Sequence, residues 1–168
     1  MLEAMNIENV KDFNPVEKIG EEWMLITAGN GTKVNTMTAN WGSIGFIWGK
    51  PSATIYVRQT RYTKEFIDNN DYFSICFFPK KYKKELGYLG AHSGRNEDKI
   101  GKVNFNVDFV DGVPYFKQAT TIIICKKAYS QTMNEESILS PDVLKRYYDK
   151  DSVHTLYIGE IKQSYLNK

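Results

Sequence analysis

Residues 54–69 read TIYVRQTRYTKEFIDN, a stretch that joins a strand to a short helix through a polar turn. Residues 54–57 are β-branched or aromatic, which favours a strand. Residues 63–69 favour a short helix, with Thr60 or Thr63 as its N-cap. A strand followed by a polar turn and a short helix fits a β fold in which short helices lie in the connections between strands.

Strand-like segments dominate on both sides of this stretch, and helical signals are few. Asp111-Gly112 predicts a hairpin turn between residues 105–110 and 113–116. One helix is expected after Pro79 and another at Ser140-Pro141, where proline takes the first helical position. The remaining predicted strands are residues 23–27, 34–41, 72–78, 120–125 and 155–161. Because strands and helices do not alternate regularly, the pattern predicts a mainly β fold, an antiparallel barrel with short peripheral helices.

Length and composition suit a single domain that spans residues 1–168. Hydrophobic residues make up 42% and charged residues 25%, which are ordinary values for a globular protein. Aromatic residues reach 14%, which suits a β-structured core or a site that stacks on planar ligands. The net charge of +2 argues against a dedicated nucleic-acid binder, which is usually far more basic.

The cysteines and histidines exclude several kinds of site. Cys76 and Cys125 form no C-x-x-C pair and lie in apolar runs, so we expect two buried thiols of a reducing compartment. His92 and His154 are the only histidines, so we expect no metal site. No apolar run approaches the roughly 20 residues of a membrane span, and no signal-peptide pattern is seen. We therefore expect a cytoplasmic protein without membrane contact.

Two polar segments carry the chemistry that a phosphate group requires. Residues 58–63 supply two guanidinium groups, two hydroxyl groups and the first free N–H groups of a helix. Residues 93–99 supply Ser93 and Arg95 as donors, Lys99 as a cation and Gly94 for close backbone approach. Each segment alone also fits a solvated loop or cap with surface cations. Both in one small domain predict a shared phosphate, whereas residues 45–50 lack the spacing of a phosphate loop.

Two further features stand out from an ordinary β protein. Residues 35–41 read NTMTANW, with small and polar side chains where a core strand carries Val or Ile. This segment is either a solvent-facing edge strand or a strand whose backbone lies against a flat polar ring. His154 precedes the last predicted strand and is either a structural group or a functional one.

The ordered set of motifs resembles the flavin reductase-like family of FMN-binding split-barrel proteins, in the branch similar to flavoredoxin. The matching blocks span most of the chain. They are residues 35–45 (NTMTANWGSIG), Pro51, 56–67 (YVRQTRYTKEFI), 72–74, 89–90, 93–95, 98–99 and 154–160 (HTLYIGE).

This resemblance implies a split β-barrel of the Greek-key type that forms a homodimer, with FMN near the subunit interface. It places His154 at the nicotinamide side of the flavin, as the candidate catalytic residue. The residues implied to bind FMN are Asn35, Met37, Thr38, Ala39, Asn40, Trp41, Ser43, Arg58, Gln59, Thr60, Arg61, Thr63, Ser93, Gly94, Arg95 and Lys99.

Two functions are compatible with such a site. The first is an NAD(P)H-dependent flavin reductase, in which NAD(P)H passes a hydride to FMN and electrons continue to an acceptor protein. The second is a non-enzymatic FMN-binding electron carrier of the flavoredoxin type, which needs the same FMN site. A third hypothesis, a small barrel that binds nucleic acid, is disfavoured by the nearly neutral charge.

Overall fold

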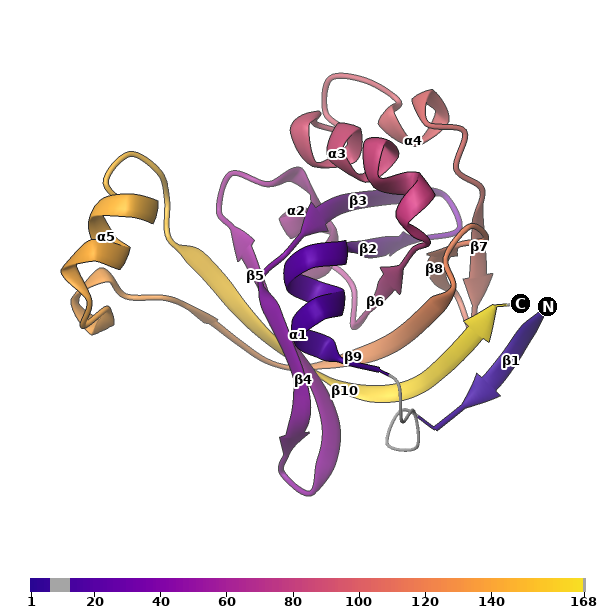
Figure 1. Ribbon diagram of the computed structural model, residues 1–168, viewed down its shortest axis with the longest axis horizontal. Helices are drawn as coiled ribbons and strands as arrows, with labels where there is room; N and C mark the ends of the chain where they lie inside the picture. Colours follow the sequence, from indigo (N-terminus) through magenta and orange to yellow (C-terminus); the bar gives the residue numbers. More distant parts are fainter. Residues whose placement is uncertain (7–12, 168) are drawn as a thin grey trace.

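The computed structural model describes residues 1–6 and 13–167 of the chain (Figure 1). Its strands are β1 (Leu2–Met5), β2 (Met24–Asn30), β3 (Lys33–Ala39), β4 (Gly42–Ile47), β5 (Lys50–Arg58), β6 (Tyr72–Phe77), β7 (Val107–Val110), β8 (Val113–Phe116), β9 (Thr121–Thr132) and β10 (His154–Asn167). An eight-stranded antiparallel sheet has the order β3-β2-β6-β9-β10-β5-β4, with β1 on β10, while β7 and β8 form a separate hairpin. The mainly β split-barrel fold is thus confirmed.

Short helices lie at the periphery of this sheet. They are α1 (Pro15–Glu17), which continues as the π-helix η2 (Lys18–Glu22), then α2 (Tyr62–Asp68), the 3₁₀ turn η3 (Lys80–Tyr82), α3 (Lys83–Ala91), α4 (Lys99–Lys102), the 3₁₀ turn η4 (Glu135–Ser137) and α5 (Pro141–Tyr147). The Thr38 hydroxyl donates to the carbonyl of Leu86 at 2.6 Å, which fastens α3 to the edge strand β3. In Figure 1, α5 lies on an extension between β9 and β10 that points away from the rest of the molecule.

The central strands are buried on both faces, which explains their largely apolar sequences. Along β2 and β6, Ile26 and Ile75 join one core cluster, whereas Leu25 and Cys76 join the other. Successive side chains of a strand point to opposite faces, so a strand covered on both sides needs apolar residues throughout. Cys76 and Cys125 are both free and fully buried, and burial raises the pKa of the Cys76 thiol to about 11.

Several elements depart from the sequence-based expectation. The missed strand β4 pairs with β5 in a hairpin that turns at Trp48 (φ 54°) and Gly49 (φ 72°). Both β9 and β10 run beyond the predicted segments. The polar and mostly exposed residues 126–132 of β9 pair with the first half of β10, whereas the last residues of β10 pair with the buried half of β9 and with β1. The N-cap of α2 is Arg61, so neither expected cap is correct: Thr60 precedes the N-cap, and Thr63 lies in the first turn of the helix.

The hairpin turn at Asp111 (φ 48°) and Gly112 (φ 80°) is confirmed, since both residues adopt the left-handed backbone of a two-residue turn. The expected cap of α5 is also present, with Ser140 accepting from the Val143 amide at 3.4 Å. In the described part of the chain, no helix is both long and apolar enough to cross a membrane.

Candidate functional site

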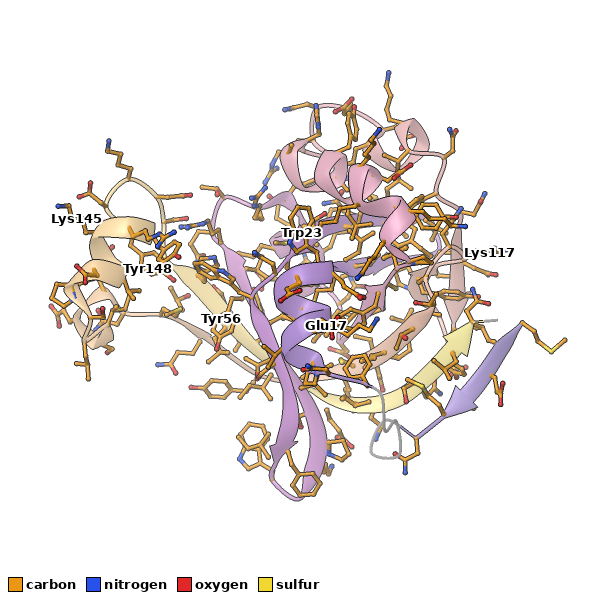
Figure 2. The ribbon with its side chains drawn as sticks, in the orientation of Figure 1. Glu17, Trp23, Tyr56, Lys117, Lys145 and Tyr148 are labelled. Atoms are coloured by element: carbon orange, nitrogen blue, oxygen red, sulfur yellow. The ribbon has the colours of Figure 1, made fainter. Side chains whose placement is uncertain are left out.

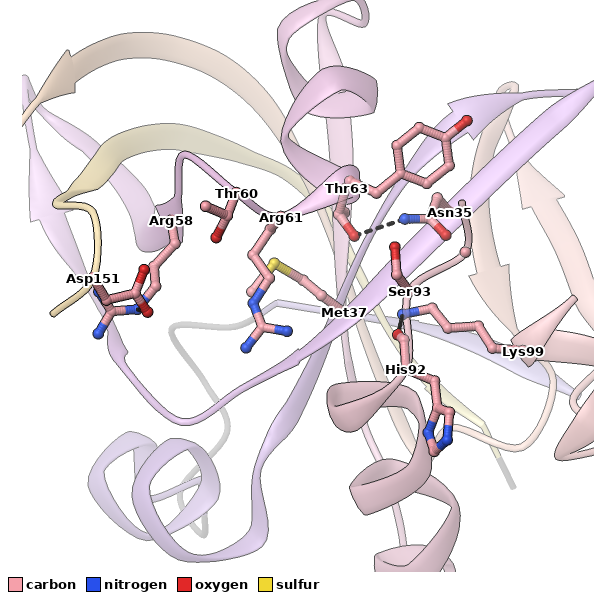
Figure 3. A pocket seen from close by; sticks show the side chains of 12 residues that line it. Asn35, Met37, Arg58, Thr60, Arg61, Thr63, His92, Ser93, Lys99 and Asp151 are labelled. Atoms are coloured by element: carbon pink, nitrogen blue, oxygen red, sulfur yellow. Dashed lines mark hydrogen bonds and ion pairs between the residues drawn. The ribbon is translucent and has the colours of Figure 1, made fainter. Parts of the chain in front are cut away.

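The two polar segments predicted from the sequence meet at one cavity. The turn between β5 and α2 forms one side, and the loop after α3 with the start of α4 forms another (Figure 3). We call this space, of about 210 Å³, the polar cavity. Its lining residues are Asn35, Met37, Arg58, Thr60, Arg61, Tyr62, Thr63, His92, Ser93, Gly94, Lys99 and Asp151.

Two cations of the polar cavity lie on the carboxyl end of α3. Lys99 is buried and donates to the carbonyls of Leu89 (2.7 Å) and His92 (2.9 Å). Arg61 donates to the carbonyl of Gly90 at 3.0 Å but is otherwise exposed. The carbonyls at a helix C-terminus carry partial negative charge, which favours cations at this position.

Electrostatics make this cavity suitable for an anion. Burial, and next the nearby charge of Arg61, lowers the pKa of Lys99 to about 8. A lowered lysine pKa means that the charged form is disfavoured in the folded protein. A negatively charged group placed between Lys99 and Arg61 would relieve both the repulsion and the loss of hydration.

Buried polar contacts fix the shape of the cavity wall. The Asn35 side chain donates to the hydroxyl of Thr63 at 2.9 Å, which ties β3 to the start of α2 (Figure 3). Gly94 packs so closely on this pair that an added Cβ would collide with the Asn35 side-chain oxygen. Glycine is therefore required at 94 by close approach, and Asn35 and Thr63 position the loop that carries Ser93.

The exposed edge of β3 continues the site away from the polar cavity. Within the described sheet β3 pairs only with β2, so its outer backbone groups lack a strand partner. A second cavity of about 150 Å³ adjoins this edge and shares three residues with the polar cavity. We call it the His154 bay, lined by Met37, Thr38, Ala39, Asn40, Trp41, Tyr56, Arg58, Arg61 and His154.

His154 is held as a neutral imidazole in this bay. Its side chain is only 7% exposed, its Nδ1 atom lies 3.0 Å from the Tyr148 hydroxyl, and its ring centre lies 5.0 Å from that of Trp41. Burial, and next the charge of Arg58, lowers the pKa of His154 to about 4. The ring can therefore accept or donate a hydrogen bond near neutral pH without carrying charge.

Three residues predicted to bind cofactor lie outside these two cavities. Gln59 donates to the Thr155 hydroxyl at 2.7 Å. Arg95 forms an ion pair with Glu65. Ser43 lines a separate hollow beside α1, at the other end of the Asn40–Gly42 turn. Their roles as cofactor ligands remain predictions.

The sequence matches the model of the flavin reductase like domain over residues 17–168. This protein belongs to the flavin reductase-like family. A search of curated proteins gives no match.

Solved structures with the family fold cover almost the whole chain. An FMN-binding domain of a flavin reductases-like enzyme from Shewanella baltica is 16% identical, with a TM-score of 0.71, and the match covers 99% of this chain and 78% of that one. Flavoredoxin from Methanosarcina acetivorans is 24% identical, with a TM-score of 0.70 and coverage of 99% and 76%. The styrene monooxygenase flavin reductase from Pseudomonas putida S12 is 13% identical, with a TM-score of 0.64 and coverage of 88% and 80%.

Some site residues of this flavin reductase-like protein were missed from the sequence. Tyr56 lines the His154 bay and precedes Arg58 by two residues in β5, so the two-residue period of a strand could have placed it there. The sequence gives no comparable signal for Tyr148, which is the C-cap of α5, or for Asp151, which follows that helix. Both are far from β5 along the chain.

Proposed function

We propose that this protein binds FMN, with the phosphate in the polar cavity and the ring system along the edge of β3. The observation that carries the proposal is the meeting of Arg61 and buried Lys99 at one cavity that also presents the hydroxyl groups of Thr60 and Ser93. The FMN phosphate is a dianion near neutral pH, and such a group is matched by two cations and short polar donors. The donor set present thus fits FMN.

The free edge of β3 suits the polar rim of the flavin ring. The outward-facing backbone N–H and C=O groups of an edge strand have no strand partner. They can therefore form hydrogen bonds with a ligand that lies beside the strand. Residues 37–41 line the His154 bay beside this edge, which supports the sequence-based hypothesis of a backbone against a flat ring.

We further propose that the protein is an NAD(P)H-dependent flavin reductase. Bound FMN supplies the hydride acceptor for such a reaction. His154, neutral and hydrogen-bonded through Nδ1 to Tyr148, orients the nicotinamide side by a hydrogen bond and transfers no proton. Trp41 closes the same bay and restricts the access of water.

The alternative is a non-enzymatic electron carrier that receives electrons from one protein and gives them to another. The similarity to a flavoredoxin over 99% of this chain supports this alternative. It requires the same FMN site but no productive nicotinamide bay. In both cases we propose an acceptor protein as partner, and the two buried thiols suit a cytoplasmic, reducing location.

We also propose a homodimer in which the β4–β5 hairpin contributes to the interface. Its tip exposes Phe46 (68%) and Trp48 (60%), and the Trp48 ring lies 6.4 Å from that of Tyr129 on β9. Figure 2 shows aromatic side chains projecting from the end of this hairpin. Exposed apolar groups of this size are typical of a surface that another chain covers.

Stopped-flow reduction of the FMN-loaded protein by NADH and by NADPH tests the enzymatic proposal. Rapid bleaching of the flavin absorbance by either nucleotide supports the reductase. No reduction by either, in a sample that dithionite reduces normally, supports the electron carrier.

A further inference from the structure

The residues between β9 and β10 form an excursion whose returning end contacts the side chain of Arg58 at several points. We call residues 133–153 the arm, which includes η4 and α5. In Figure 1 the arm leaves the sheet and returns to it at the start of β10, where His154 lies. The returning end of the arm therefore leads directly into His154, a residue that lines the His154 bay.

Arg58, at the end of β5, holds this returning end. It donates from Nη1 to the carbonyl of Ser152 (2.6 Å) and from Nη2 to the carbonyl of Tyr147 (3.0 Å). Its Nε atom lies 3.3 Å from the Asp151 carboxylate, as Figure 3 illustrates, and its guanidinium lies 5.4 Å from the centre of the Tyr148 ring. All three nitrogens of the planar guanidinium are thus engaged with the arm.

The segment that Arg58 holds also packs against two residues that line the His154 bay. Tyr147 packs edge-on against Trp41, with ring centres 4.9 Å apart. Tyr148, the next residue, places its hydroxyl 3.0 Å from Nδ1 of His154. Release of the arm would remove both contacts together.

Arg61 offers a contrast at the same cavity. Among the described residues, its side chain makes one hydrogen bond, to the carbonyl of Gly90, and it is exposed. Arg61 can turn toward an anion at little cost, whereas Arg58 would first have to give up its contacts with the arm. Both line the polar cavity and the His154 bay.

We propose that Arg58 is a positioning residue that fastens the arm and thereby fixes Trp41, Tyr148 and His154, rather than a ligand of the phosphate. The flavin part of its test rests on the proposed function, whereas the part that measures the arm does not. An arginine is needed because its planar guanidinium group reaches two carbonyls and a carboxylate together, which a lysine ammonium cannot do.

The test compares Arg58→Gln and Arg58→Lys with Arg61→Gln as the matched control. Amide hydrogen exchange is measured for residues 133–153, and affinities are measured for FMN and for riboflavin, which lacks the phosphate. In both Arg58 variants we expect exchange in the arm to accelerate at least tenfold, with exchange in β2 and β6 unchanged. We expect the ratio of FMN to riboflavin affinity to stay within threefold of the parent value.

The control should behave in the opposite way. Arg61→Gln should leave exchange in the arm unchanged and lower the affinity ratio at least tenfold. Because the chain has two histidines, NMR resolves the His154 imidazole. We expect its signals to shift in both Arg58 variants, including Arg58→Lys, which retains the positive charge.

Selective loss of FMN affinity in Arg58→Gln, or unchanged exchange in the arm, would overturn the proposal. If Arg58→Gln does not fold, Asp151→Ala removes one of the contacts of Arg58 from the arm side. Asp151→Ala should accelerate exchange in the arm about threefold. Unchanged exchange in Asp151→Ala would also overturn the proposal. A parent protein that binds no FMN would defeat the proposed function but leave the exchange and NMR results to decide the role of Arg58.

Discussion

Arg61 and Lys99 lie at the same cavity but differ in how firmly the protein holds them. The Lys99 side chain is buried and donates hydrogen bonds to two backbone carbonyls. The Arg61 side chain is exposed and donates to one. The carboxyl end of α3 thus holds both cations at the cavity before any anion arrives. This arrangement lets each residue be tested separately.

Replacing Arg61 with Ala should weaken FMN binding selectively. Loss of one charge-assisted contact costs about 1.5–3 kcal/mol, or about ten- to a hundredfold in affinity. Riboflavin should bind the variant about as well as the parent protein, as fluorescence titration with each flavin would measure. An equal loss for both flavins would mean that Arg61 acts through folding instead.

The affinity for FMN should fall as the pH rises above 8. Lys99 has a pKa of about 8 in the free protein, and a bound dianion raises that pKa. Between these two values the complex holds a proton that the free protein lacks, so binding takes up a proton and weakens with pH, by at most about tenfold per unit. Titrations from pH 7 to pH 10 would measure this, and Lys99→Met should flatten the dependence. A riboflavin affinity that falls just as steeply would contradict the assignment.

Residue chemistry alone predicted that segments 58–63 and 93–99 converge, and they do line one cavity. It did not predict which of the two guanidinium groups, that of Arg58 or that of Arg61, is free to turn toward the cavity. Arg58 and Arg61 look equivalent in sequence, but Arg58 meets carbonyls of the arm, whose position depends on tertiary structure. Contacts between residues so distant in the chain have no local signature.

At the scale of elements, the packing of the loop after α3 depends on Gly94. A Gly94→Ala variant would force the added Cβ against Asn35, which cannot turn away without losing Thr63. We expect a loss of about 1–3 kcal/mol in the free energy of unfolding and weaker FMN binding, measured by urea denaturation and by titration.

Gly87→Ala is the control for this change. An added Cβ at Gly87, inside α3, meets nothing within 4 Å. Alanine should stabilise the helix by up to about 1 kcal/mol there. If Gly94→Ala were as stable as Gly87→Ala, the proposed close packing of the loop on Asn35 would be wrong.

Elements were predictable where burial dictated their sequence. The core strands β2 and β6 are largely apolar because both faces are covered, and the predicted segments 23–27 and 72–78 overlap the first part of β2 and the whole of β6. The hairpin strand β4 and the outer part of β9 are exposed, so their residues obey no burial pattern. Their strand character comes from pairing with a neighbour, which a single segment does not encode.

At the scale of the whole molecule, the exposed tip of the β4–β5 hairpin leads us to expect a dimer. Light scattering at micromolar concentration should give twice 19.4 kDa. The double variant Phe46→Glu/Trp48→Lys should give the monomer mass, because it places charge on the proposed interface. Val16→Lys, at another residue that is 79% exposed, should remain dimeric. A monomeric parent protein with FMN bound would contradict this prediction.

The central claim is that the sheet edge and the polar cavity together form an FMN site. The most direct measurement is titration of flavin-free protein with FMN, followed by flavin absorbance and fluorescence. The account predicts saturable binding of one FMN per chain, with riboflavin binding more weakly because it leaves Arg61 and Lys99 without an anion. No saturable binding of FMN by the folded protein would contradict it.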